Sequence, residues 1–535
     1  MQAFGLSCQG GLNTNLNQFQ MLEQPGFATE LQNFEVDPDG GYRRINGFTS
    51  YGGGSAARPN SSNSILGLFV YGDGVIACSG TNIYFTLDGT SWLQINRSSV
   101  SGSGDNYSTF TGRSTAARTS QGQATFALYE GDSTYGEIVI TDKGSGVKPA
   151  LFKMTGTGAL ADRTFFYEEV TVSGTHYPKF CTIHDKHLVV AGAATALNTI
   201  YYSGTSDINS FSSTGSGSIV LDDQVVGLRS FRGDLIIFCK NSIYKLININ
   251  DSSNIAIVPI TQNVGCLDGH SIQEIGGDLI FLSPDGFRLV AGTARIGDVE
   301  LSSVSRQIQS IVSSIAANIN TYVISSAVLR SKSQYRLFYS SSSGSSTTAK
   351  GLIGTITPRG FEWSETIGIQ AHGFTSGFDN DSVEQVYHGD KDGYVYNHNT
   401  GNDFNPAGSS ANIDARYKTP NLDFGDAGTL KSLHYAKISF TPEGTVQPTL
   451  KITYDFDDTN RPQPPVYTLD SIPTPAVFGD STLGTAVFGA SSDPMARQAV
   501  QGSGHNIAFK IYSQDTNAPY SINGFYVDYR PSGRR

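Results

Sequence analysis

The residue types of a metal site stand together between positions 181 and 187. The run Cys181-Thr-Ile-His184-Asp-Lys-His187 places a thiol and two imidazoles in one short segment. Thiolates and imidazoles are ligands that zinc sites use. The segment also alternates as a strand leading into Leu188-Val-Val190, and successive side chains of a strand point to opposite faces. We therefore expect Cys181, His184 and His187 to be ordinary strand residues, with a zinc site as the alternative.

Carboxylates cluster at three further places, in a spacing that calcium sites share with turns. Asp side chains two residues apart beside glycine can bind calcium. None of the clusters completes an EF-hand loop, and Asp, Asn and Gly are also the residues of tight turns. We therefore predict turns at these clusters: Asp379-Asn-Asp381, Asp390-Lys-Asp392-Gly393 and Asp455-Phe-Asp457-Asp458.

One segment favours a rival function. Thr86-Leu-Asp88-Gly89-Thr90-Ser91-Trp92 resembles the Asp-box hairpin of sialidase-like propellers, Ser-x-Asp-x-Gly-x-Thr-Trp, with one residue between Asp and Gly missing. An Asp box staples a blade turn and is not catalytic. A glycosidase also needs paired carboxylates or a tyrosine nucleophile in one pocket. The segment keeps a propeller-fold glycosidase open as the alternative function.

The sequence lacks the motifs of nucleotide-binding and hydrolytic chemistry. It contains no G-x-x-x-x-G-K-[ST], no G-x-G-x-x-G after a strand, no H-E-x-x-H and no G-x-S-x-G. We therefore predict that the protein is not an enzyme and has no catalytic residue, no cofactor-binding residue and no metal ligand.

The elements that carry these residues read as short strands. The chain holds 26 Tyr and 30 Phe but 4 Met, and its short apolar runs alternate with Gly, Asn, Asp and Ser. Turns such as Ser283-Pro-Asp-Gly286 combine a preset φ at proline with a positive φ at glycine. Four hairpins are predicted: Val75–Cys78 with Ile83–Phe85, Leu235–Phe238 with Ile243–Leu246, Leu279–Leu282 with Phe287–Val290, and Val386–His388 with Tyr394–Tyr396.

The spacing of matching second strands indicates a repeat. These strands are His187–Val190, Leu235–Phe238, Leu279–Leu282, Tyr335–Phe338 and Val386–His388. Most steps are about 43–50 residues, the period of a four-stranded propeller blade. An unrelated series of antiparallel sheets is the alternative. One longer step contains a predicted helix near 303–319, with Ser302 or Ser303 as its cap.

We predict a mainly β fold with a β-propeller-like central domain, an antiparallel β-sandwich or sheet domain at the C-terminal end, and one short helix. The predicted parts are an N-terminal docking segment at 1–60 that completes the sheet region, the propeller at 61–400 and the C-terminal domain at 401–535. Polar residues near 94–125 read as a long surface insertion or as a separate lobe on the propeller. The Pro462–Pro494 loop is long enough to reach a neighbour.

Charge and composition exclude several classes of protein. Lys and Arg number 36 against 47 Asp and Glu, a net charge of −11, so tight duplex binding through clustered cations is not expected. No stretch approaches 18 apolar residues, so we expect no membrane segment, and the first residues lack a signal-peptide pattern. Five widely spaced cysteines fit reduced, mostly buried thiols: Cys8, Cys78, Cys181, Cys239 and Cys266.

Short motifs follow one another in a fixed order along nearly the whole chain. The opening motifs are Gly10-Gly11-Leu12-Asn13, Gln24-Pro25-Gly26-Phe-Ala28, Leu31-Gln-Asn33-Phe34, Pro38-Asp-Gly40-Gly41 and Arg43-Arg44-Ile-Asn-Gly47-Phe48. Later motifs are Ile200-Tyr-Tyr-Ser203, Asp234-Leu-Ile-Ile-Phe238, Asn241-Ser-Ile-Tyr244, Val264-Gly-Cys266, Gly276–Gly286, Leu422-Asp-Phe-Gly-Asp426 and Val527–Arg535. In this order, the motifs resemble the tail nozzle proteins (tail tubular protein B) of short-tailed bacteriophages.

The resemblance implies a structural component of a short phage tail. Such a protein forms a homohexameric nozzle below the adaptor ring of the head–tail connector. Viral DNA is ejected through the lumen without specific binding, and tail fibres or a needle attach nearby. The protein is then located in the virion tail and made in the host bacterial cytoplasm. The alternative is a propeller-fold glycosidase or a receptor-binding tail protein that acts on host surface glycans.

The acidic balance suggests a physical use in such a conduit. Six copies at −11 each carry −66. We hypothesise that carboxylates facing the lumen repel phosphates and let the duplex slide, whereas a basic lining would bind it. Charges that face outward for solubility are the alternative.

Overall fold

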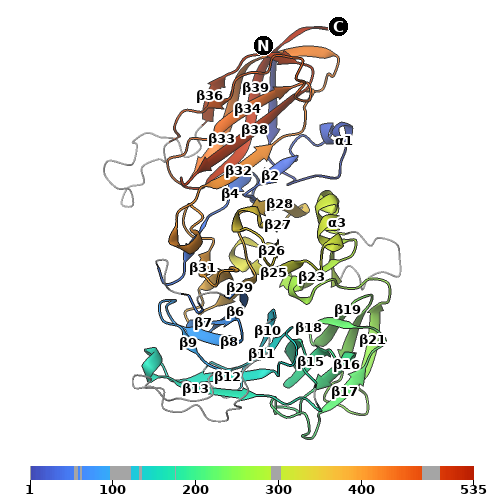
Figure 1. The fold of residues 1–535 in the computed structure, drawn as a ribbon. Coiled ribbons are helices and arrows are strands. Elements are labelled where there is room, and N and C mark those ends of the chain that lie inside the picture. Colours follow the sequence, from blue (N-terminus) through green and yellow to red (C-terminus); the bar gives the residue numbers. More distant parts are fainter. Residues whose placement is uncertain are drawn as a thin grey trace.

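The computed structural model describes residues 2–53, 58–60, 63–96, 122–131, 135–174, 176–290, 303–472 and 495–534. Most of the predicted insertion at 94–125 and of the Pro462–Pro494 loop lies outside these ranges. Figure 1 shows a propeller at the bottom of the view and a β-sandwich at the top, with both chain ends at the far end of the sandwich. No helix among the described residues is long and apolar enough to cross a membrane.

Six small sheets form the blades of the propeller. The first two are β6–β9 (Ile65–Tyr71, Gly74–Ser79, Asn82–Thr86, Leu93–Gln94) and β10–β13 (Ala124–Tyr129, Glu137–Asp142, Ala150–Thr155, Thr164–Glu169). The next two are β14–β17 (Phe180–His184, His187–Ala193, Ala196–Tyr202, Gly217–Val220) and β18–β21 (Val225–Phe231, Asp234–Cys239, Ile243–Ile247, Ala256–Thr261). The last two are β22–β24 (Gln273–Ile275, Asp278–Ser283, Gly286–Leu289) and β29–β31 (Gly373–Phe378, Glu384–Gly389, Val395–His398) with β5 (Phe48–Ser50).

A four-stranded meander closes the ring between the fifth and sixth blades. It consists of β25–β28 (Tyr322–Leu329, Gln334–Ser341, Lys350–Thr357, Gly360–Ile367). Its first strand, β25, packs between β22 and β29, in the way that β10 packs between β6 and β14. The meander therefore takes a place in the ring, but its outer strand continues into the sandwich instead of facing solvent.

The continuation is the larger of the two sandwich sheets. Strand β2 (Glu30–Gln32) lies between β28 and β32, parallel to the former and antiparallel to the latter. The sheet ends with β32, β38, β34 and β35 (Ile413–Lys418, Ile507–Asp515, Thr449–Tyr454, Tyr467–Thr468). The second sheet holds β1, β3, β4, β33, β36, β37 and β39 (Gln2–Ser7, Phe34–Val36, Tyr42–Arg44, Thr429–Pro442, Met495–Ala499, Ser503–Gly504, Tyr520–Arg534).

The sandwich and the meander share one hydrophobic core. The largest buried cluster includes Tyr417 and Phe525 between the sandwich sheets, and continues to Trp363 and Leu337 in the meander. The Trp363 indole is fully buried and donates its Nε1–H to the Val304 carbonyl oxygen at 2.8 Å. Because large aromatic side chains contribute much of the stabilisation from burial, this shared core couples the two modules energetically.

The strand predictions agree with the structure. All four predicted hairpins are present as adjacent antiparallel strands: β7 with β8, β19 with β20, β23 with β24 and β30 with β31. The five segments that gave the period are all second strands, either of a blade or of the meander. The mainly β propeller fold is therefore confirmed.

The helix prediction is correct in place but not in its cap. The helix α3 (Gln309–Ala317) follows a 3-10 turn at Arg306–Ile308 and buries Val312 and Ile315. Ser303 is not its cap, because the α-helix begins several residues later and its N-cap makes no side-chain hydrogen bond; Ser302 lies outside the described residues. The short helix α1 (Gln18–Leu22) was not predicted, although Asn17 and Gln20 form a capping box at its start.

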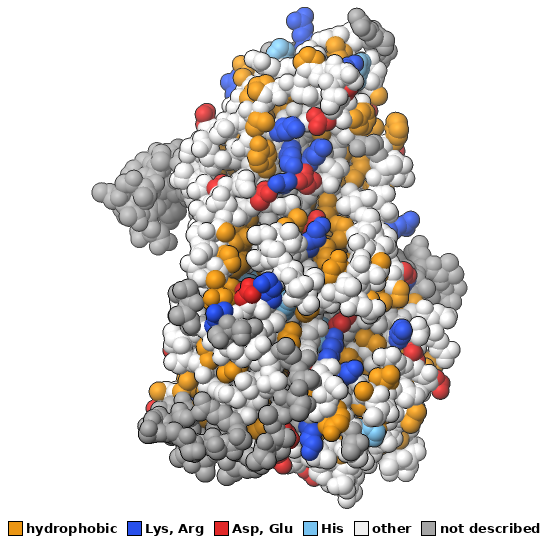
Figure 2. All heavy atoms as spheres, viewed as in Figure 1, with side chains coloured by type: hydrophobic (Ala, Val, Ile, Leu, Met, Phe, Trp, Pro, Cys, Tyr) orange, Lys and Arg blue, Asp and Glu red, His pale blue; other side chains and the backbone are white. Residues whose placement is uncertain are grey.

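Charged side chains on the face seen in Figure 2 are interspersed with polar and apolar ones. A group of Lys and Arg lies over the sandwich with Asp and Glu beside it. On the larger sandwich sheet, Lys510 pairs with Glu30 at 2.6 Å and Arg416 pairs with Asp414. These two cations are therefore each paired with a carboxylate of the same sheet.

Candidate functional site

The predicted zinc candidates occupy β14 and β15 and each has its own partner. The Cys181 thiol is buried against the Thr125 and Val139 carbonyl oxygens, and burial raises its pKa to about 11. His184 Nδ1 lies 2.9 Å from the Ser230 hydroxyl, and His187 Nδ1 lies 2.6 Å from the Ser203 carbonyl oxygen. Across the described residues, no group of three or more His, Cys, Asp or Glu has the arrangement of a metal site.

The three acidic clusters form turns, as predicted. Asp379 accepts the backbone N–H groups of Asp381 and Val383, and the Val383 bond is the main reason that its pKa is lowered. Asp390 accepts the N–H groups of Asp392 and Tyr394. The third cluster makes a tight turn with positive φ at three consecutive residues, Asp455, Phe456 and Asp457.

Asp88 staples the turn between β8 and β9. Its carboxylate accepts the Thr90 hydroxyl at 2.6 Å and the Thr90 and Ser91 N–H groups. These bonds, led by the one from the Thr90 hydroxyl, lower its pKa. The Trp92 indole donates to the Gly89 carbonyl oxygen at 3.1 Å. The segment therefore stabilises a turn of this blade, as an Asp box does. The Asp88 carboxylate is occupied by the hydrogen bonds of that turn.

All five cysteines are buried thiols that form no disulfide. Burial raises the pKa of Cys8, Cys239 and Cys266 to about 12. A thiol with a raised pKa is a poor nucleophile, because the thiolate is the reactive form. The expectation of buried thiols is confirmed, and we assign these three cysteines a structural role.

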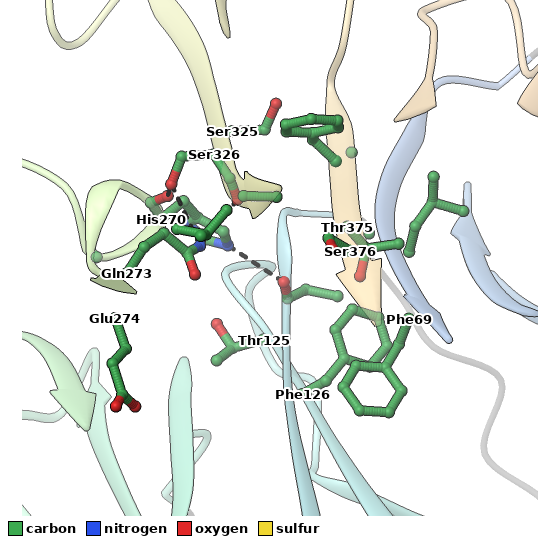
Figure 3. Close-up of a pocket in the computed structure, with 18 of the residues that line it drawn as sticks. Phe69, Thr125, Phe126, His270, Gln273, Glu274, Ser325, Ser326, Thr375 and Ser376 are labelled. Atoms are coloured by element: carbon green, nitrogen blue, oxygen red, sulfur yellow. Dashed lines mark hydrogen bonds between the residues drawn. The ribbon is translucent and has the colours of Figure 1, made fainter. Parts of the chain in front are cut away.

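The first strands of the ring enclose a pocket of about 300 Å³ at the propeller axis, which we call the axial pocket (Figure 3). Its walls come from β6, β10, β18, β22, β25 and β29 and from the 3-10 turn Gly269–Ser271. Phe69 and Phe126 stack on one side with ring centroids 5.5 Å apart. His270 and Gln273 lie on the other side. No sequence motif indicates this pocket, because its residues are dispersed mainly over the first strands of separate blades.

The axial pocket does not hold a pair of carboxylates. Glu274 supplies the single carboxylate among the described residues that line it, and Figure 3 shows this side chain apart from the others. The nearby Asp268 binds Lys143 at 2.8 Å and the His270 N–H. Although burial opposes ionisation of Asp268, these two partners lower its pKa overall. A glycosidase mechanism with two carboxylates flanking one bond has no basis in this pocket.

The opening sequence motifs lie together elsewhere, in residues 8–48, which we call the strap. The strap runs from the sandwich along β28 to the sixth blade. The Gly10 N–H donates to the Glu362 carboxylate at 2.8 Å, and the Leu12 N–H donates to the Trp363 carbonyl oxygen at 2.7 Å. Gly11 has φ +73°, and a Cβ there would meet the Trp363 backbone at 2.8 Å. Only glycine satisfies both conditions without strain.

Asn33 fixes the middle of the strap between β28 and β32. Its Nδ2 donates to the carbonyl oxygens of Ile367 and Asp414 at 3.0 and 2.9 Å, and its Oδ1 accepts the Ile367 N–H at 2.9 Å. The residue adopts φ +54°, which asparagine tolerates better than most residues. One side chain thereby ties the meander strand to the sandwich strand.

A buried ion cluster completes this junction. Glu35 contacts Arg43, Lys332 and Arg336 at 2.7 to 2.8 Å, and we call these four residues the joint network. Burial disfavours the Glu35 carboxylate, but the three cations outweigh it and lower its pKa to about 2. Arg43 also pairs with Glu443 of the sandwich. The network thus connects the strap, the meander and the sandwich.

Comparisons with known proteins give no family. No family model and no curated protein matches the chain. Among solved structures, exo-β-1,3-galactanase from Phanerochaete chrysosporium with galactose has a TM-score of 0.26 and 8% identity, and covers 94% of this chain and 99% of its own. A variant of that enzyme with β-1,3-galactotriose has a TM-score of 0.26 and 9% identity, and the match covers 93% of this chain and 99% of that one.

A further structure, the extracellular domain of BT4673 from B. thetaiotaomicron, gives a TM-score of 0.34 at 12% identity. It covers 66% of this chain, which spans 40% of its length. At these scores the likeness carries no conclusion about this chain.

Proposed function

We propose that this protein is a structural component of a short phage tail. Six copies form a nozzle below the adaptor ring, through which viral DNA leaves the particle, and its outer surface docks tail fibres. The protein is placed in the virion tail and performs no catalysis.

The proposal rests on the position of the sequence motifs that resemble those of nozzle proteins. The opening motifs form the strap, whose glycines, Asn33 and Arg43 join the propeller to the sandwich. None of these residues faces the axial pocket. Motifs that hold a joint are expected of a load-bearing tube, whereas an enzyme would show its shared residues in a pocket.

The rival function receives less support from the same residues. A glycosidase needs two carboxylates at one bond, and the described lining of the axial pocket offers Glu274 alone. The Asp-box-like segment is a turn staple. If the protein hydrolysed a host glycan and the Glu274→Gln variant did not, the glycosidase function would be supported instead.

Electron microscopy of the purified protein with its adaptor ring tests the proposal. We expect six-fold rings whose central channel is about as wide as a DNA duplex, since a conduit must pass the duplex while contacting its phosphates weakly. Absence of rings in the presence of the adaptor would contradict the nozzle. Once the ring is imaged, replacing lumen-facing Asp and Glu with Lys is expected to slow ejection, and unchanged kinetics would contradict electrostatic sliding.

A further inference from the structure

One arginine of the axial pocket has no carboxylate to balance it. Arg229, on β18, lies in the pocket wall, and no Asp or Glu of the described chain lies within ion-pair distance of its guanidinium. Its one hydrogen bond donates from Nη2 to the Ile272 carbonyl oxygen at 3.1 Å. Burial lowers its pKa, which records the cost of holding this charge away from water.

The other donors of Arg229 have no hydrogen-bond partner among the described residues. A guanidinium has five N–H groups. None of its nitrogens is among the described buried atoms that lack a partner, so the unused donors are not sealed from solvent, and Arg229 lines the pocket. An unbalanced, partly desolvated guanidinium in a concave site is a receptor for an oxyanion, because carboxylates and phosphates match its donor geometry.

The remaining titratable groups of the pocket do not cancel this charge. His270 and His372 have lowered pKa values, to about 4 for His372, because burial disfavours their cationic forms, so both are neutral near pH 7. Arg330 adds a second cation and lies over the Phe378 ring at 5.3 Å. Glu274 is exposed and stands apart in Figure 3. The fixed charges therefore leave the pocket net positive.

The opposite wall suits a compact ring. The stacked Phe69 and Phe126 are partly buried and present apolar surface beside Thr125. The Gln273 side chain is oriented by the hydrogen bond from its Nε2 to the Ser326 carbonyl oxygen at 2.8 Å. Its Oε1 is left to act as an acceptor. Aromatic walls with a few fixed polar groups are typical of small-molecule sites, and about 300 Å³ is at the lower end of their size range.

We propose that the axial pocket binds an acidic monosaccharide unit, with its carboxylate on Arg229 and its ring against Phe69 and Phe126. The hydroxyl groups of the sugar would meet Thr125 and the Gln273 amide. The site binds and does not cleave, since it has one carboxylate. This inference does not depend on the nozzle function, because it uses residues outside the strap.

Isothermal titration of the full chain with D-glucuronate, D-glucose and inorganic phosphate tests the proposal. We expect saturable glucuronate binding with a dissociation constant of about 1 mM or tighter, and at least about tenfold weaker binding of glucose and phosphate. Equal binding of phosphate would reduce the site to a general oxyanion site and overturn the sugar. Equal binding of glucose, or no binding of glucuronate, would overturn the role of Arg229.

Matched arginine variants locate the binding. Arg229→Gln is expected to weaken glucuronate binding by at least about tenfold, because it removes a charged hydrogen-bond donor. Arg232→Gln is the control: Arg232 also donates to one carbonyl oxygen of the fifth blade, that of Gly277, but does not line the pocket. We expect it to bind like the wild type. Unchanged binding in Arg229→Gln, with circular dichroism confirming its fold, would contradict the site.

Discussion

The joint network and the axial pocket are two charged regions of one ring, and they treat charge in opposite ways. In the joint network, Glu35 is surrounded by three cations and every member has a partner. In the axial pocket, Arg229 has one carbonyl oxygen and no carboxylate among the described residues. Full pairing favours rigidity, whereas an unpaired charge costs stability and is retained where a ligand can supply the partner.

The largest expected effect comes from removing the centre of the joint network. Glu35→Gln leaves buried Arg336 and half-buried Arg43 and Lys332 without their shared counter-charge, and we expect the free energy of unfolding to fall by about 3–5 kcal/mol. Urea denaturation measures this change. The control is Glu365→Gln, which breaks the more exposed pair with Lys350 and should cost at most about 1 kcal/mol. Similar losses of stability in both variants would mean that the joint network contributes no more than an exposed ion pair.

A glycine of the strap gives the next largest effect. Gly11 and Gly53 have nearly equal positive φ, +73° and +74°, but a Cβ at Gly11 meets the Trp363 backbone while Gly53 has nothing within 4 Å. Gly11→Ala should therefore cost about 2–4 kcal/mol from strain and overpacking, and Gly53→Ala about 1 kcal/mol from strain alone. Thermal unfolding of both proteins separates the two contributions. Equal decreases in melting temperature would show that the strap relaxes to accommodate the added Cβ at Gly11.

Acid should destabilise the fold through two buried histidines beside the joint network: His398 lies 3.0 Å from Arg336 and 3.2 Å from His388. Burial lowers the pKa of His388 to about 3 and holds that of His398 well below its ordinary value, so the folded protein keeps both neutral. As the pH falls below the ordinary value of 6.5, the unfolded chain takes up protons that the folded chain refuses, and stability decreases. Glu35 acts later: its stabilisation is complete above 4.5 and is lost as the pH falls toward 2.

Urea denaturation at pH 6.5 and 5.5 checks this order. We expect His388 to account for a loss of about 1 kcal/mol across that interval. His388→Gln should lose less stability across it than the wild type. A wild-type stability that does not change over this interval would contradict the neutral histidines.

The two regions also differ in how far sequence could predict them. Hairpins such as β19 with β20 depend on local alternation and a tight turn, so their strands could be predicted directly. The pairings that build the joint are distant: Gln32 lies opposite both Glu365 and Arg416, and β5 completes a blade more than 300 residues away. No local pattern encodes such pairings. In the sequence, Arg229 is likewise an ordinary strand residue. Whether it has a counter-charge depends on which residues the fold brings near it.

The smallest expected effect is that of Arg229→Gln on stability. The substitution removes one hydrogen bond to the Ile272 carbonyl oxygen but also removes a charge that burial disfavours. These contributions oppose each other, so we expect the free energy of unfolding to change by less than about 1 kcal/mol. Arg336→Gln in the joint network should instead cost at least about 3 kcal/mol, because it leaves buried Glu35 with one cation fewer. Urea denaturation of the pair decides between the two roles: a structural Arg229 would cost as much as Arg336, and an arginine kept for a ligand would cost little until the ligand is added.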